Sequence, residues 1–150
     1  METPRALQER SPRDSAEWER YYDLRWRVLR EPWGQPRGSE RDSLDIEAVH
    51  VAFWDDDGRP VAAGRLHLNS PTEAQVRYMV VEANYRGEKL GSRVLEVLEA
   101  RAAAAGVEHV VLNAREEAAP FYLRHGYQEI GSAGLLFGSI PHLKMRKQLR

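Results

Sequence analysis

The feature that most constrains the fold is a change in hydrophobic period around Gly91. Three apolar runs of strand length precede this glycine, Ile46 to Trp54, Val61 to Leu68 and Ala74 to Val81. After it, apolar residues follow the 3.6-residue spacing of one helix face, at positions 90, 94, 95, 97, 98 and 102. The chain is therefore expected to pass from a sheet into a long helix, ended by Gly106, through a short loop.

Further elements precede this passage. Asp14 or Ser15 is expected to cap a first helix, whose apolar residues at 18, 21, 22, 25 or 26, and 29 share one face. The Pro- and Gly-rich stretch from Glu31 to Asp45 is expected to be an ordered surface loop, and Asp55 to Gly58 a hairpin turn. The aspartates of this turn lack the later loop ligands of a calcium site, so no metal is expected there.

The C-terminal third completes the predicted fold. Val107 to Leu112 is typical of a short strand, and Glu116 to Arg124 of a short helix that stops at Gly126. Tyr127 to Leu149 contains two further candidate strands around a Gly-rich turn at 131–134. Strands followed by alternating helices and strands predict an α/β or α+β domain with a mixed sheet.

Composition narrows the class of protein. A chain of 150 residues is expected to form one domain, residues 1–150, and its net charge of -1 argues against a general nucleic-acid binder. No apolar run approaches the roughly 18 residues that span a bilayer, and the polar N-terminus lacks the apolar centre of a secretory signal. There is no cysteine for a disulfide or a thiol nucleophile. We therefore expect a cytoplasmic protein that binds neither nucleic acid nor membranes.

The strand-to-helix segment from Tyr78 to Ser92 has features of a phosphate site. The first amides of a helix have no partner within it, and the helix dipole adds positive charge there, so a phosphate satisfies both. Gly87 and Gly91 remove side chains from the approach, and Arg86 and Lys89 add positive charge. The segment matches neither a nucleoside-triphosphate loop nor a dinucleotide-binding run of glycines. Spacing alone leaves an ordinary strand–helix connection open as the alternative.

Two blocks of this sequence resemble those of one family. The segment Tyr85 to Ser92, entered from a strand ending in Val81, resembles the acyl-CoA signature of the GNAT acetyltransferase superfamily. Ala118 to Tyr127 resembles the second block of that family, and the order of elements agrees along nearly the whole chain. The stretch from Tyr21 to Asp42 is similar to the acetyltransferase half of bacterial proteins in which a GNAT domain is fused to a hotdog-type thioesterase.

The resemblance implies a fold and a co-substrate. The fold would be a GNAT-like mixed, mostly antiparallel sheet flanked by helices, splayed between the strands that end near Val81 and Asn113. The co-substrate would be acetyl-CoA, without a metal. Main-chain groups of Met79 and Val81 would bind its pantetheine arm, and Asn113 the same arm. The pyrophosphate would lie on the backbone amides of Arg86, Gly87, Glu88, Lys89, Leu90, Gly91 and Ser92.

The resemblance also implies a reaction, in which an acceptor amine attacks the thioester directly. Tyr122 matches the tyrosine that protonates the departing thiolate, and an ordinary tyrosine pKa near 10 suits that role. A base or a water chain should take the proton of the amine. The candidate bases are Glu40, Glu82, Glu116, Glu117 and His67. Glu82 alternates away from the face of Met79 and Val81, and His67 is more simply explained as a structural partner of Arg65 on the same strand face.

The acceptor site is expected between the first helix and the loop from Glu31 to Asp45. Trp33, Glu40 and Asp42 would make it aromatic and acidic, which suits a cationic amine of a small molecule or peptide. The sequence departs from the family pattern at Lys89, where glycine is usual, and at Arg115, where asparagine is common. A non-catalytic acyl-CoA-binding or interaction module therefore stays open as an alternative, and so do a homodimer and a separate thioesterase partner.

Overall fold

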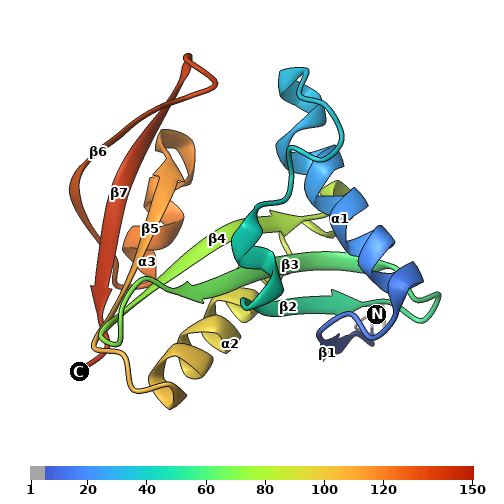
Figure 1. Ribbon diagram of the computed structural model, residues 1–150, viewed down its shortest axis with the longest axis horizontal. Helices are drawn as coiled ribbons and strands as arrows, with labels where there is room; N and C mark the ends of the chain where they lie inside the picture. Colours follow the sequence, from blue (N-terminus) through green and yellow to red (C-terminus); the bar gives the residue numbers. More distant parts are fainter. Residues whose placement is uncertain (1–5) are drawn as a thin grey trace.

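The computed structural model describes residues 6–150, which form a mixed sheet with helices on its faces (Figure 1). Within this range the sheet has seven strands in the order β1-β2-β3-β4-β5-β7-β6. The elements in chain order are β1 (Gln8–Arg10), α1 (Ser15–Leu29), β2 (Val49–Trp54), β3 (Pro60–Leu68), β4 (Glu73–Val81), α2 (Leu90–Ala104), β5 (His109–Arg115), α3 (Ala119–Arg124), β6 (Gln128–Leu136) and β7 (Ile140–Gln148). Short 3-10 turns join them, namely η1 (Glu31–Trp33), η2 (Ser43–Ile46), η3 (Ala83–Tyr85) and η4 (Glu116–Ala118).

The first helix begins where the sequence predicts. Asp14 caps α1, because its carboxylate accepts the N–H of Glu17 at 2.9 Å. The strand before it, β1, is not predicted by the sequence pattern. Its three residues show no apolar alternation, and they are extended because their backbone pairs with β2, Gln8 opposite Trp54.

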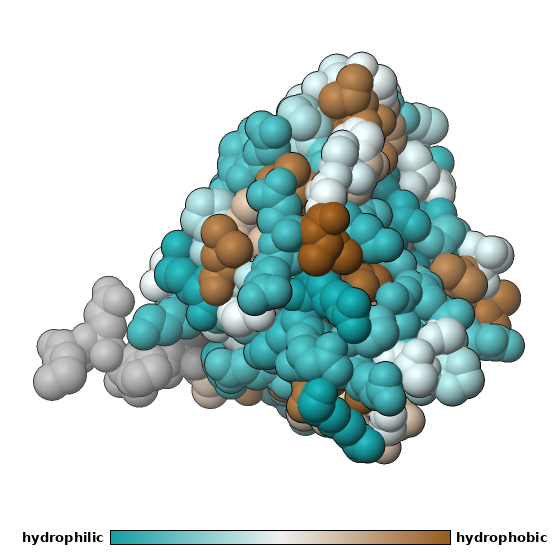
Figure 2. All heavy atoms as spheres, turned by 90° about the vertical axis from the view of Figure 1, so that its left-hand side faces the viewer, coloured by the Kyte–Doolittle hydropathy of each residue, from teal (hydrophilic) through white to brown (hydrophobic). Residues whose placement is uncertain are grey.

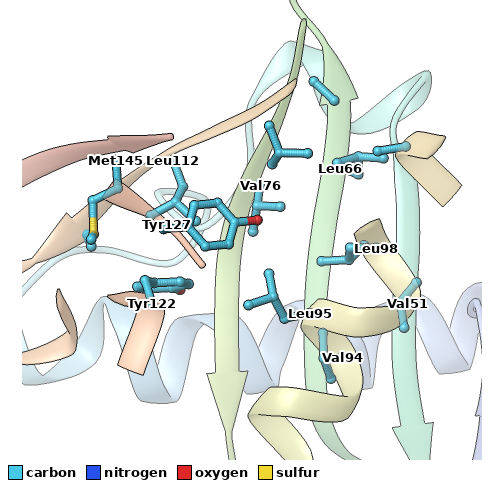
Figure 3. Close-up of a cluster of buried hydrophobic side chains, with 14 of the residues drawn as sticks. Val51, Leu66, Val76, Val94, Leu95, Leu98, Leu112, Tyr122, Tyr127 and Met145 are labelled. Carbon is cyan, nitrogen blue, oxygen red and sulfur yellow. The ribbon is translucent and has the colours of Figure 1, made fainter. Parts of the chain in front are cut away.

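Helices cover both faces of the half-sheet β1 to β4, with α1 on one face and α2 on the other (Figure 1). A cluster under α1 is formed by Tyr21, Leu24, Ala52, Trp54, Ala63 and Val80. A larger cluster lies on the other face and includes Val76, Leu95, Leu98, Leu112 and Tyr122 (Figure 3). Because both faces are covered, β2 and β3 are buried along most of their length, which explains their continuous apolar runs.

The sheet divides between β4 and β5, the one parallel pair among the described strands. These strands pair only where both begin, with Glu73, Ala74 and Gln75 opposite His109, Val110 and Val111. Beyond this point they diverge toward Val81 and Arg115 (Figure 1), while β5 stays paired with β7 as far as Arg115. The predicted GNAT-like sheet, splayed between the strands that end near Val81 and Asn113, is confirmed.

One prediction for the C-terminal hairpin is wrong. The Gly-rich turn was expected at 131–134, but Gly131 and Gly134 lie inside β6, where the register against β7 shifts. The turn itself has left-handed conformations at Phe137 (φ +53°) and Gly138 (φ +74°), and is closed by a hydrogen bond from the Ser139 N–H to the Leu136 carbonyl. Glycines therefore mark β-bulges here rather than the end of the strand.

The surface is mixed in character. Figure 2 shows the side of the molecule that β6 and β7 border, where hydrophobic side chains occur singly or in small groups among hydrophilic ones. Ile130 and Leu135 on the edge strand β6 are 50% and 60% exposed. No helix within residues 6–150 has the length and apolar character needed to cross a membrane.

Candidate active site

The loop between β4 and α2 presents backbone N–H groups at the start of a 15-residue helix. The Arg93 N–H donates to the carbonyl of Lys89 at 3.1 Å, just before the regular bonds of α2 begin. The N–H groups of Leu90, Gly91 and Ser92 therefore have no acceptor within α2. The N–H of Arg86 is already used, since it donates to the carbonyl of Ala83 at 3.3 Å. The amides that an anion could reach thus begin after Arg86.

Two residues of this loop have left-handed backbone conformations. Gly87 has a φ of +85°, and no atom lies within 4 Å of the position that a Cβ would take, so the surface over the loop is open. Lys89 has a φ of +62°, a conformation that costs an ordinary residue roughly 1–2 kcal/mol. This conformation gives a backbone reason for the glycine that is usual at this position in the family.

Helix α3 contacts the start of α2. The Nε2 of His125 lies 2.9 Å from the Ser92 hydroxyl oxygen. A Cβ built on Gly91 would lie 3.5 Å from the ring of Phe121, which is ordinary contact. The phosphate-binding candidate and α3 therefore form one continuous surface.

Tyr122 of α3 points toward the sheet, and its side chain is only 8% exposed (Figure 3). Its ring contacts those of Phe121 and Tyr127, with centroid distances of 5.0 and 5.7 Å. Burial raises the pKa of Tyr122 well above its ordinary value, so the hydroxyl keeps its proton at neutral pH. No group within residues 6–150 forms a hydrogen bond with this hydroxyl.

A cavity of about 440 Å³ occupies the splay between β4 and β5. Predicted site residues that line it are Trp33, Met79, Asn113 and Tyr122. Its other walls are the end of α1, β4 from Gln75 to Met79, β5 from Leu112 to Arg115, and the β6–β7 hairpin. Sequence reasoning missed the hairpin wall, since nothing in the pattern of β6 indicates that this hairpin borders the splay.

The open edge of β4 has unpaired backbone groups. The Glu82 N–H donates to the Val61 carbonyl on β3 at 2.8 Å. Because N–H and C=O groups alternate between the two edges of a strand, those of Val81 and Met79 face the splay. Tyr78, with a φ of +57°, is at an irregularity in the β3–β4 register and precedes these two residues. This geometry supports the predicted main-chain contacts, which stay a prediction.

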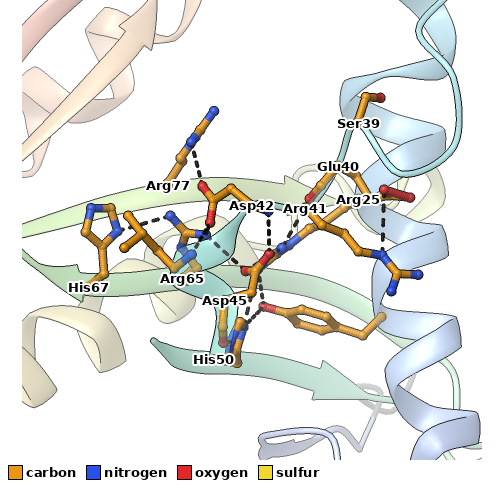
Figure 4. A network of polar contacts seen from close by, with 12 residues as sticks. Arg25, Ser39, Glu40, Arg41, Asp42, Asp45, His50, Arg65, His67 and Arg77 are labelled. Carbon is orange, nitrogen blue, oxygen red and sulfur yellow. Dashed lines mark hydrogen bonds and ion pairs between the residues drawn. The ribbon is translucent and has the colours of Figure 1, made fainter. Parts of the chain in front are cut away.

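The acidic residues predicted for the acceptor site lie elsewhere (Figure 4). Glu40 is 2% exposed, and its carboxylate accepts the Gly38 N–H within the same loop. Asp42 accepts hydrogen bonds from Arg65 at 2.6 Å and Arg77 at 2.8 Å. Partial burial acts to raise the pKa of Asp42, but the hydrogen bond and charge of Arg65, the Leu44 N–H and the charge of Arg77 together outweigh it, and the pKa is lowered. Neither carboxylate lines the cavity, because Glu40 is bound within its own loop and Asp42 binds that loop to the sheet.

Three other base candidates also have structural partners. Glu82 forms a two-pronged ion pair with Arg27, with both N–O distances at 2.9 Å. The Nδ1 of His67 lies 3.1 Å from a guanidinium nitrogen of Arg65, as the shared strand face predicts. Glu117 lies 3.5 Å from Arg115 and is largely exposed. Among residues 6–150, none of the base candidates lines the cavity.

Comparison with known proteins identifies the family. The model of the acetyltransferase (GNAT) family matches residues 18–127. The chain is 34% identical over 112 residues to the uncharacterized N-acetyltransferase YjcF of Bacillus subtilis (strain 168), covering 75% of this chain and 79% of the relative. This protein therefore belongs to the GNAT family and is an N-acetyltransferase.

Solved structures agree with the fold. A putative N-acetyltransferase from Lactobacillus plantarum superposes with a TM-score of 0.82 at 22% identity, covering 97% of this chain and 99% of that one. An aminoglycoside 6'-N-acetyltransferase complexed with coenzyme A has a TM-score of 0.79 at 19% identity, covering 97% of both chains. Identities this low establish similarity of fold alone.

Proposed function

We propose that this protein transfers an acetyl group from acetyl-CoA to the amine of a small molecule or peptide by direct attack. The observation that carries the proposal is the position of Tyr122. This buried, protonated hydroxyl lines the cavity in the splayed sheet, and the helix that carries it packs against the start of α2, where three backbone amides have no acceptor within the helix.

The residues present fit the co-substrate. The amides of Leu90, Gly91 and Ser92 would hold a pyrophosphate, and the open approach over Gly87 leaves room for it. The exposed backbone edge at Met79 and Val81 would pair with the amides of the pantetheine arm, with Asn113 on the opposite strand. Glu88 and Lys89 would border the pyrophosphate. The N–H of Arg86 already donates to Ala83, so Arg86 could act on the pyrophosphate only through its side-chain charge.

The chemistry requires two proton transfers. Acetyl-CoA supplies an activated carbonyl and a thiolate leaving group. Tyr122 would give its proton to the sulfur as the C–S bond breaks, and solvent would take the proton that the amine loses as the C–N bond forms. Solvent would then return a proton to Tyr122 before the next turnover. Because no base candidate lines the cavity, we assign the second transfer to water rather than to a side chain.

Calorimetric titration with acetyl-CoA tests the binding half of the proposal. One-site binding is expected, and at a hundredfold excess over Kd it should stabilise the fold by about 2.7 kcal/mol. Gly91→Glu places a carboxylate at the start of α2 and should abolish binding. Ala100→Glu adds the same charge on an exposed part of the same helix and should leave binding intact. Binding that is equal in both variants would refute the assignment of this loop.

Two tyrosine variants test the catalytic half. Tyr122→Phe should lower kcat at least tenfold without changing acetyl-CoA affinity, because it removes only the proton donor. Tyr127→Phe removes a hydroxyl that donates to Glu99 at 2.9 Å, so it should lower the melting temperature and leave kcat unchanged. If acetyl-CoA binds but no amine from a broad panel is acetylated, the protein is instead a non-catalytic acyl-CoA-binding module.

The remaining expectations concern assembly. A homodimer, a separate thioesterase partner and a cytoplasmic location stay predictions from the resemblance and from composition. Light scattering of the purified protein tests the first. Co-purification from the native cells tests the second, and cell fractionation the third.

A further inference from the structure

The ionisable side chains that line the cavity are cationic or imidazole. Besides the tyrosines Tyr78 and Tyr122 they are Arg30, Arg77, Arg115 and His142, and no carboxylate lines the cavity in the described part of the chain. The arginines come from the end of α1, from β4 and from β5, so positive charge surrounds the cavity on several sides. This charge is the opposite of the acidic acceptor site that the loop composition predicts.

Arg30 is the most telling of these residues, because it is only 6% exposed. Its guanidinium donates to the carbonyls of Ser39 at 3.0 Å and Leu29 at 3.2 Å, and it forms no ion pair within residues 6–150. Burial and the neighbouring charge of Arg77 lower the pKa of Arg30, against smaller opposing effects of the Tyr78 hydroxyl and of Glu40. A buried guanidinium without an ion-pair partner in contact is costly, and an anion in the cavity would offset that cost.

The other two arginines lie where they can act on the same anion. Arg77 and Arg30 flank the ring of Tyr78, with Cζ atoms 4.6 and 5.5 Å from its centroid. Asp42 binds one nitrogen of Arg77, which leaves other donors of its fork. Arg115 lies at the end of β5, across the splay from β4, with its Cζ 5.4 Å from the ring centroid of Trp33 in η1. Its ion-pair partner, Glu117, is solvent-exposed. Aromatic rings thus contact the guanidinium groups of three arginines that line the cavity.

We propose that the acceptor is an amine that carries a carboxylate, of the amino-acid type, and that Arg30, Arg77 and Arg115 bind this carboxylate. This inference rests on the proposed acetyl transfer and specifies the class of amine that accepts the acetyl group. Guanidinium forks match carboxylates in geometry and charge. The same positive charges disfavour an ammonium group, so they promote the neutral amine that must attack. The cavity can therefore work without a carboxylate base.

Equilibrium binding tests the carboxylate site independently of catalysis. The probes are the N-acetyl derivatives of the twenty common amino acids, each compared with its N-acetyl primary amide, by calorimetry on the whole chain. At least one acid should bind, and its amide should bind at least tenfold more weakly. In Arg77→Gln and in Arg115→Gln the affinity for the acid should fall about tenfold, which corresponds to ~1.4 kcal/mol, while the affinity for the amide stays the same. Arg59→Gln removes an exposed arginine outside this cavity and should change neither.

The outcomes separate this inference from the proposed function. If no acid binds, if acid and amide bind equally, or if both arginine variants keep full affinity for the acid, the carboxylate site is refuted. Acetylation of amines that lack a carboxylate, without preference for amino acids, also refutes it while the acetyltransferase proposal stands. Selective binding of an acid without any acetyl transfer supports the carboxylate site and refutes the proposed reaction instead.

Discussion

Neutralising Glu17 tests how strand β1 is held against helix α1. Both carboxylate oxygens of Glu17 accept hydrogen bonds from Arg10 at 2.7 Å, and one of them also accepts the Arg13 N–H at 2.8 Å. The bonds from Arg10 outweigh the effect of burial and lower the pKa of Glu17 from 4.5 to about 2. This difference in proton affinity between unfolded and folded chain corresponds to about 3 kcal/mol of stability at neutral pH.

The sign of the pH dependence follows from the lowered pKa. The stabilisation is fully present above about pH 5, where Glu17 is ionised in both states, and is lost as the pH falls toward 2. Urea unfolding of Glu17→Gln should therefore show a loss of about 3 kcal/mol at pH 7 and of only about 1.4 kcal/mol at pH 3. The matched control is Glu19→Gln, an exposed glutamate on the same helix, which should change stability by less than about 0.5 kcal/mol at either pH. A loss that is the same at pH 7 and pH 3 would refute the assignment of this stability to the ionised carboxylate.

Three further substitutions test the backbone and the core by urea unfolding or thermal melting. Lys89→Gly relieves the left-handed conformation at φ +62° and should raise the free energy of unfolding by up to about 1 kcal/mol; a decrease would contradict the strain. Gly64→Ala places a Cβ 2.7 Å from the nearest side-chain atom and should cost about 1–3 kcal/mol, so an unchanged melting temperature would contradict this packing. Asp45→Asn removes the carboxylate that Arg25 and Arg65 contact at 2.9 and 3.0 Å, and should cost about 3–5 kcal/mol. A cost below about 1 kcal/mol would show that these buried charges are compensated elsewhere.

The elements with a strong local signal could be predicted from the sequence. Helix α1 has a capping aspartate, and the hairpin between β2 and β3 has its turn where Asp55 accepts the N–H groups of Asp57 and Arg59. Strand β1 could not be predicted, because its extended form comes from pairing with β2 and leaves no pattern in three polar residues. The glycines of β6 were assigned to a turn because a bulge and a turn require the same backbone freedom.

The candidate site also has parts that the sequence could predict and parts that it could not. The segment from Tyr85 to Ser92 and the position of Tyr122 carry local signals, since both belong to short contiguous motifs that match one family. The charge of the acceptor cavity could not be inferred from the composition of the loop that borders it. Glu40 and Asp42 follow closely in sequence on Trp33, which lines the cavity. The Glu40 carboxylate, however, binds within the loop, and the Asp42 carboxylate binds the sheet.

The sequence by itself determined the order of the elements, the family and the strand-to-helix loop, because each depends on residues that are neighbours along the chain. Tertiary structure decided which side chains face the splay between β4 and β5. Arg30 and Arg115 are 85 positions apart in the numbering, and only the divergence of two strands and the packing of α1 bring them to one cavity. Contacts of this kind depend on the packing of the whole sheet, and no local pattern of residues encodes them.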